Sequence, residues 1–165
     1  MKINIKKLRD NAVIPARGSD SAAGCDLYAC LNHRGGFTIQ PNQTVKVNTG
    51  IAVEIPDGYF GAIFARSGLA TNKGLRPANC VGVVDSDYRG EIIVALHNDT
   101  DAKQTFGDGE RIAQLVIIPY LPVEFNEVDE LDETVRGAGG FGSTGTTTIE
   151  TKEPEYEQLS LFDNE

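Results

Sequence analysis

Short apolar runs separated by turn-forming residues are the feature that most limits what this chain can fold into. Patterns of helical period are almost absent from the 165 residues, whereas short alternating or apolar runs recur at a spacing typical of all-β proteins. Because such strands bury one face against other strands, we expect an all-β fold, a jelly-roll-like β-barrel. The runs predict strands at Ile3–Leu8, Thr44–Asn48, Ile51–Ile55, Tyr59–Phe64, Val81–Val84, Glu91–Leu96, Arg111–Ile118 and Val123–Glu127.

Turn residues and one short helix separate these strands. Pro56-Asp57-Gly58 stands between two of the runs, where proline presets φ and glycine supplies a positive φ, so we expect a tight turn. The one helix that the pattern predicts begins near Ser67 and ends at Lys73-Gly74.

The composition changes after Phe141. Small polar residues follow at 142–148, and an acidic segment follows them. Sequence of this kind buries too little apolar surface to offset the entropy lost on ordering. We therefore expect a folded body at 1–130, a mobile glycine-rich arm at 131–145 and a disordered acidic tail at 146–165.

The charge distribution excludes some classes of partner. The formal net charge is −9, and residues 146–165 hold six acidic residues and one lysine, which leaves −4 for residues 1–145. Direct binding of nucleic acid is not expected, because its affinity rests on clustered Lys and Arg. No apolar run approaches the roughly 18 residues of a membrane helix, and no signal-type stretch opens the chain, so we expect a cytoplasmic protein without a membrane segment.

Cysteine and histidine offer no zinc site. Cys25, Cys30 and Cys80 are odd in number and lack paired ligand spacing, so we expect reduced thiols in or near the core. His33 and His97 have no neighbours that would complete a tetrahedral set. A metal that acts here should therefore be a hard, oxygen-bound ion such as Mg²⁺.

Three segments concentrate residues suited to a phosphorylated ligand. Arg66-Ser67-Gly68 lies where a strand meets the short helix, a geometry that presents backbone N–H groups to an anion, although a buried arginine beside a helix cap would look the same. The segment Gly82–Gly90 is predicted to be a hairpin whose polar connection carries Asp85 and Tyr88. The segment Arg136–Gly145 combines glycines, hydroxyls, an arginine and a phenylalanine, which suits a phosphate and a base better than a plain linker.

Five segments in chain order resemble the motifs of one family. They are Ala23–Leu27, Arg66–Ala70, Asn79–Gly90, Gly109–Gln114 and Arg136–Gly145. Together they resemble the trimeric dUTPases, or deoxyuridine 5'-triphosphate nucleotidohydrolases, over about residues 20–145 of this chain. Cys25 and Cys80 depart from the family's commoner residues at positions that carry no chemistry.

The resemblance implies a jelly-roll homotrimer that hydrolyses dUTP to dUMP and pyrophosphate. Each site would combine the hairpin of one chain, the Arg66 and Gln114 segments of a second, and the arm of the third. Asp85 would be the general base, and Asp26 would act on Mg²⁺ through a water molecule. The residues that would bind substrate are Arg66, Ser67, Gly68, Asn79, Val83, Val84, Asp85, Tyr88, Ile93, Gln114, Arg136, Phe141, Gly142, Ser143 and Thr144.

Two other functions stay open at this point. The dCTP deaminases share the fold, but they typically carry a second serine after the Arg-Ser pair, where Gly68 stands here. A regulator that binds nucleotide without turning it over is the second alternative, which the retained Asp85 disfavours.

A further motif lies in the tail. Gln158-Leu159-Ser160-Leu161-Phe162 resembles the peptide by which bacterial polymerases and repair proteins bind the DNA sliding clamp. Apolar residues clustered in an otherwise acidic terminus are typical of a docking peptide.

Overall fold

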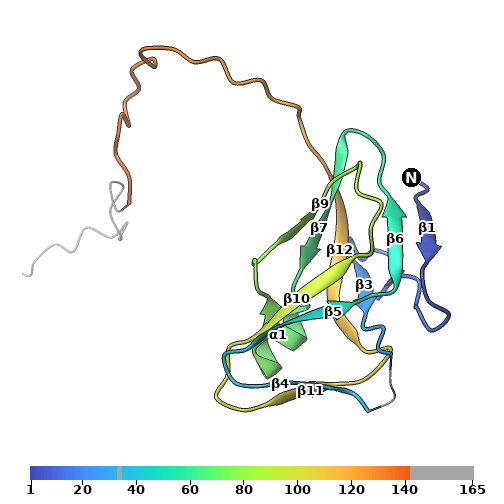
Figure 1. The fold of residues 1–165 in the computed structure, drawn as a ribbon. Coiled ribbons are helices and arrows are strands. Elements are labelled where there is room, and N and C mark those ends of the chain that lie inside the picture. Colours follow the sequence, from blue (N-terminus) through green and yellow to red (C-terminus); the bar gives the residue numbers. More distant parts are fainter. Residues whose placement is uncertain (33–34, 142–165) are drawn as a thin grey trace, which may run out of the picture. The chain divides into compact units, whose positions relative to one another are not determined.

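The computed structural model describes residues 1–32 and 35–141, and the chain divides into two units, Met1–Val123 and a second that begins at Glu124. The first unit contains twelve strands and one helix among the described residues (Figure 1). In chain order they are β1 (Asn4–Lys7), β2 (Ala16–Arg17), β3 (Cys25–Tyr28), β4 (Phe37–Ile39), β5 (Thr44–Asn48), β6 (Ile51–Glu54), β7 (Tyr59–Phe64), α1 (Ser67–Lys73), β8 (Leu75–Pro77), β9 (Gly82–Val84), β10 (Ile93–Asn98), β11 (Gln104–Phe106) and β12 (Arg111–Pro119).

Four antiparallel sheets make up the first unit. The largest has the order β2-β3-β12-β7-β9, and a second has the order β5-β10-β8. Two further pairs, β1 with β6 and β4 with β11, complete the arrangement, and Figure 1 shows β4 and β11 at one end of the unit. The all-β, jelly-roll-like prediction is confirmed.

The core lies between the sheets, and most of its large side chains are branched aliphatic ones. In β10 the burial alternates along the strand, and Val94 and Leu96 are buried while Ile93 is exposed. Each fully buried Leu or Ile contributes roughly 1.5–3 kcal/mol to folding. The largest side chains with less than 2% exposure are Leu27, Ile39, Ile51, Ile55, Leu75, Ile92, Leu96 and Ile112.

One buried amide ties two loops to this core. Asn98 is fully buried, and its Nδ2 donates to the carbonyls of Ile39, Gln40 and Ala102 at 3.2, 3.1 and 2.8 Å. Its Oδ1 accepts from the amide of Thr100 at 3.0 Å and from the Thr100 hydroxyl at 2.8 Å. Since each polar atom of the side chain is satisfied, the amide is compatible with complete burial.

The predicted turn and helix are confirmed. Gly58 has a φ of 81°, and the amide of Tyr59 donates to the Pro56 carbonyl at 3.2 Å. Helix α1 has the predicted bounds, and Gly74 ends it in the left-handed conformation at a φ of 59°. A glycine suits that conformation because it has no Cβ.

The predicted hairpin at Gly82–Gly90 is wrong as a paired ladder. Strand β9 is hydrogen-bonded to β7 in the five-stranded sheet, whereas β10 is hydrogen-bonded to β5 and β8. The β9–β10 connection, residues 85–92, therefore crosses from one sheet to the other. A separation between the two strands is the structural basis of the site described below.

The predicted strand at Val123–Glu127 is also wrong. Residues 120–134 have no regular structure, and no strand within residues 1–32 or 35–141 pairs with them. The alternation of apolar and acidic residues favours a strand, but a strand forms only where a neighbour accepts its hydrogen bonds.

The three cysteines are free, but they differ in exposure. Cys30 is buried and its thiol donates to Asn11 Oδ1 at 3.2 Å, while Cys25 is half-buried. Burial raises the pKa of the Cys30 thiol, which keeps it protonated and unreactive. Cys80 is exposed, so the prediction of a near-core thiol is wrong for that residue.

No helix in the described part of the chain is both long and apolar enough to cross a membrane.

Candidate active site

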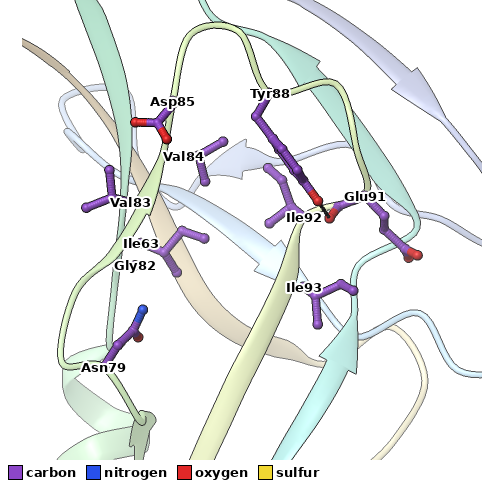
Figure 2. Close-up of a pocket in the computed structure, with 10 residues that line it drawn as sticks. All are labelled: Ile63, Asn79, Gly82, Val83, Val84, Asp85, Tyr88, Glu91, Ile92 and Ile93. Atoms are coloured by element: carbon purple, nitrogen blue, oxygen red, sulfur yellow. Dashed lines mark hydrogen bonds between the residues drawn. The ribbon is translucent and has the colours of Figure 1, made fainter.

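A pocket of about 230 Å³ opens between β9 and β10 (Figure 2). Strand β9, the β9–β10 connection and the start of β10 supply most of its wall. Val83, Tyr88 and Ile93 are 63%, 45% and 44% exposed, so an apolar surface faces the solvent here. Of the residues predicted to bind substrate, those that line this pocket are Asn79, Val83, Val84, Asp85, Tyr88 and Ile93.

The backbone of β9 offers polar groups to this pocket. It is the terminal strand of its sheet and pairs only with β7, through the register of Val84 with Gly61. Its other edge has no ladder partner among the residues that the structure describes. Unpaired N–H and C=O groups on a strand edge are ready to hydrogen-bond the edge of a planar ring.

The ring of Tyr88 lies across the backbone of the β9–β10 connection. Its hydroxyl donates to the carbonyl of Glu91 at 3.0 Å, and its amide donates to the carbonyl of Asp85 at 3.2 Å. A Cβ on Gly90 would lie 2.5 Å from Tyr88 Cζ, so only glycine allows the ring this position. Position 90 therefore needs glycine, because the Tyr88 ring approaches the backbone too closely there for any side chain.

Asp85 stands exposed at the rim of the pocket, on the side of β9 (Figure 2). Its carboxylate forms no ion pair or hydrogen bond with any side chain of the described residues, and its backbone carbonyl closes the turn to Tyr88. A carboxylate that is uncommitted within the fold is free to hold a hydroxyl group and a water molecule.

A second pocket, of about 470 Å³, lies beside α1 and carries three cationic side chains. Arg66, Lys73 and Arg111 line it, and Glu110 is its one acid. Helix α1 has no side-chain cap and no acidic residue in its first turn, so the backbone N–H groups of Ser67 and Gly68 lack a capping partner. The arrangement suits an anion with several oxygens.

Asp26 is committed to two arginines. Its Oδ1 accepts from Arg66 Nε at 2.7 Å, and its Oδ2 accepts from Arg111 Nη1 at 3.2 Å. The carboxylate is 12% exposed, so it orients both guanidinium groups from within the fold. Each oxygen keeps one lone pair, which can accept a hydrogen bond from a water molecule. No cluster of three metal-binding side chains forms within residues 1–32 and 35–141.

Gln114 is held against Ala65, which follows β7 and precedes Arg66. Its Nε2 donates to the Ala65 carbonyl at 2.8 Å. A Cβ at Gly24 would lie 2.5 Å from Gln114 Oε1, so the Ala23–Leu27 motif needs glycine to make room for this side chain. Gln114 lies outside the pocket beside α1, although it borders the arginine that lines it.

The hydrogen bonds of the described part of the arm are local. Arg136 Nε donates to the carbonyl of Gly139 at 2.9 Å, and the amide of Gly139 donates back at 3.0 Å. Phe141 is fully exposed. The predicted substrate residues Gly142, Ser143 and Thr144 lie outside the described residues, as does the peptide at 158–162.

Sequence reasoning missed several residues that the fold brings to these sites. Ile63, Gly82, Glu91 and Ile92 line the first pocket. Arg111 lines the second and binds Asp26. The sequence predicted the strand β12, which begins at Arg111. The ion pair between Arg111 and Asp26 could not be predicted, because it depends on the pairing of β12 with β3.

Comparisons with known proteins agree on one family. The family model described as dUTPase matches residues 10–145. The deoxyuridine 5'-triphosphate nucleotidohydrolase of a Hydrogenobaculum species is 48% identical over 127 residues, which cover 77% of this chain and 86% of that protein. The enzyme of the same name from Desulfitobacterium hafniense is 49% identical over 132 residues, with coverage of 78% and 86%.

Solved structures agree with these sequence relatives. The dUTPase of a Staphylococcus bacteriophage, 80alpha, with dUPNHPP superposes with a TM-score of 0.80 at 28% identity, over 88% of this chain and 99% of that chain. A mutant dUTPase of phage phi11 of S. aureus, described with a structural Mg(II) ion, shares the fold at a TM-score of 0.72 and 23% identity. Because the family model spans residues 10–145 and two bacterial relatives match at nearly half identity, this chain belongs to the dUTPase family.

Proposed function

We propose that this protein is a dUTP diphosphatase, which hydrolyses dUTP to dUMP and pyrophosphate by water attack on the α-phosphorus. The observation that carries the proposal is the pocket between β9 and β10, where an apolar slot, a free strand edge and an uncommitted carboxylate meet. The bacterial relatives carry the name of this activity. Such an enzyme keeps uracil out of DNA and supplies dUMP for thymidylate synthesis.

The free edge of β9 supports recognition of uracil. A backbone C=O that accepts from N3–H and a backbone N–H that donates to O4 would leave buried groups unpaired if cytosine entered instead. Asn79, Val83, Val84 and Ile93 line the slot that the base would enter. Close backbone approach at C5 would exclude the methyl group of thymine.

Tyr88 and Asp85 support recognition of the sugar and activation of water. The exposed ring of Tyr88 would lie against the deoxyribose, where a 2'-hydroxyl would collide with it. Asp85 would hold the 3'-hydroxyl and take a proton from the attacking water. General-base assistance of this kind is worth about 10²–10⁴ in rate.

The cationic pocket beside α1 supports binding of the triphosphate. Arg66 and the amides of Ser67 and Gly68 would hold the α- and β-phosphates, with Gln114 beside them. The lining adds Arg111 to the residues expected from the sequence. We propose Arg136, Ser143 and Thr144 as the clamp on the γ-phosphate, and Phe141 as the side chain that stacks on uracil.

Mg²⁺ would neutralise charge on the triphosphate oxygens. The remaining lone pairs of Asp26 fit a hydrogen bond from a water of that ion. Asp26 would thereby hold both the ion's hydration shell and the guanidinium groups of Arg66 and Arg111.

Two observations support a homotrimer in which chains share each site. The pocket between β9 and β10 and the pocket beside α1 have no residue in common, which suits a site built from different chains. Large apolar side chains at 121–135 are exposed, including Leu121, Phe125 and Leu131 at 86%, 93% and 87%. Apolar side chains exposed to this extent would gain from burial against another chain. The segment 131–145 would then close over a neighbouring site, and 146–165 would remain outside the body formed by 1–130.

The test is release of pyrophosphate from dUTP, UTP, dTTP and dCTP, with an assay for ammonia in the dCTP reaction. We expect turnover of dUTP alone. Ammonia from dCTP would favour the dCTP deaminases, and tight binding of dUTP without turnover would favour a nucleotide-dependent regulator.

The charge of −9 argues against direct binding of nucleic acid. We propose that the protein acts in the cytoplasm, because the pool of deoxynucleotides used for DNA synthesis argues for action there.

The terminal sequence supports a second interaction. We propose that Gln158, Leu159, Ser160, Leu161 and Phe162 bind the bacterial DNA sliding clamp. Three apolar residues in a segment otherwise rich in acid favour a docking peptide, and a trimer would display three copies, so avidity would strengthen a weak single contact. The enzyme would then be concentrated where dUTP is incorporated.

Capture of a purified bacterial clamp tests this interaction. We expect the full chain to retain the clamp, and both a Leu161→Ala/Phe162→Ala variant and a chain ending at Gly145 to lose it. Hydrolysis of dUTP should stay intact in both, because neither change touches the proposed site. Clamp binding that survives either change would refute the assignment.

A further inference from the structure

Glu91 lies near the end of the β9–β10 connection, and its carboxylate accepts three hydrogen bonds from residues outside that connection. Oε2 accepts from Arg9 Nη2 at 3.1 Å and from Asn48 Nδ2 at 2.6 Å. Oε1 accepts from the backbone amide of Gly50 at 2.7 Å. The carboxylate is 17% exposed. It therefore joins the connection to the end of β5, to the β5–β6 turn and to the segment after β1.

The backbone of the same residue holds Tyr88. The Tyr88 hydroxyl donates to the Glu91 carbonyl at 3.0 Å, the bond drawn in Figure 2, and the ring lies over Gly90 without room for a Cβ. The ring is 45% exposed, so packing alone does not fix it. The ring position therefore depends on the backbone of residues 90 and 91. The carboxylate of Glu91 helps to hold that backbone, together with the hydrogen bonds of the buried Ile92 to Ile51 and Thr49.

We propose that Glu91 is a positioning residue for the choice of deoxyribose over ribose, acting through the ring of Tyr88. The inference rests on the proposed function and deepens it. Exclusion of a 2'-hydroxyl by shape requires the ring to stand at a defined height against the sugar. A shift of about 1 Å in a positioned group is enough to change rates by up to about 100-fold. Arg9, which lines neither pocket, becomes part of the selection through Glu91.

The chemistry of the contacts explains why a carboxylate is needed. All three partners of Glu91 present donors, and a carboxylate offers acceptors on both oxygens. Glutamine keeps the size but replaces one acceptor with an amide donor. Glu91→Gln therefore brings a donor against a donor on at least one partner.

The experiment compares kcat/KM for dUTP with that for UTP. We expect Glu91→Gln to lower the ratio about tenfold or more, since a displaced ring admits ribose and holds deoxyribose less well. The matched control is Glu54→Gln, the same substitution at an acid that contacts Asn4 and Arg89 and lines neither pocket. It should leave the ratio within about twofold, as expected for a surface change.

A double variant separates positioning from simple destabilisation. Tyr88→Phe removes the hydroxyl that reaches Glu91, so Tyr88→Phe/Glu91→Gln should select no worse than Glu91→Gln alone. Arg9→Ala, which removes one donor, should give a smaller loss and serves if Glu91→Gln does not fold. A lowered melting temperature with an unchanged ratio, or additive losses in the double variant, would overturn the proposal. If the wild type failed to prefer dUTP, the proposed function itself would fail instead.

Discussion

Replacing Asp85 with asparagine is expected to reduce kcat for dUTP about 10²–10⁴-fold while the Kd for dUTP changes little. Asparagine preserves the shape at the pocket rim and still hydrogen-bonds a 3'-hydroxyl, but it cannot take a proton from water. Because Asp85 forms no ion pair with the described residues, its loss should not destabilise the fold.

Single-turnover kinetics and equilibrium binding measure the two quantities separately. Asp87→Asn is the matched control, because Asp87 is an exposed acid of the same connection that lies outside the pocket lining. It should retain near-normal kcat. An Asp85→Asn enzyme that kept more than about a tenth of the wild-type rate would contradict the general-base role.

The same variant tests whether chains share their sites. Asp85→Asn and Arg66→Ala should each be nearly inactive alone. If the two residues serve one site from different chains, co-expression of the two variants should produce mixed trimers that contain some sites with both residues intact, and activity should return. A mixture with no more activity than its parts would mean that each chain holds its own complete site.

Removing residues 136–165 is expected to lower kcat/KM for dUTP by about 10²-fold or more, without loss of the folded body. The core lies within Met1–Val123, and the described residues of the arm bond only among themselves. Closure over the bound nucleotide would exclude water and complete the phosphate contacts. Circular dichroism should therefore show the same β-rich fold, and sedimentation should give the same number of chains per particle as for the full chain.

Two variants sharpen this prediction. A chain ending at Gly145 keeps the arm and loses the tail, and it should turn over dUTP like the full chain. Phe141→Ala should weaken nucleotide binding by about 1–3 kcal/mol through lost stacking. Because the ring is fully exposed, the change should leave the folded body intact. Normal activity in both the Phe141→Ala variant and the chain without residues 136–165 would show that the arm has no role.

Local chemistry was enough to predict several elements from the sequence. Strands β5 and β7 and helix α1 have the predicted bounds, and Gly58 and Gly74 adopt the positive φ that their turns require. In these segments side-chain alternation, turn residues and capping agree, so the local sequence already favours one conformation. The motif at Asn79–Gly90 likewise predicted a site. An aspartate and a tyrosine beside an apolar run can bind a ligand whichever strand that run pairs with.

Pairing between distant strands decided the rest. The short strands β2, β3, β4, β8 and β11 were missed, because two to four residues show little alternation and a strand has no internal hydrogen bonds. The separation of β9 from β10 into different sheets, which opens the pocket, depends on partners at β7 and β5. Asp26 contacts Arg111 only through the pairing of β3 with β12. Glu91 contacts Arg9 only because the fold brings together two segments that are 82 residues apart in the sequence. Sequence alone determines which residues can do chemistry, whereas non-local backbone hydrogen bonds determine which of them meet.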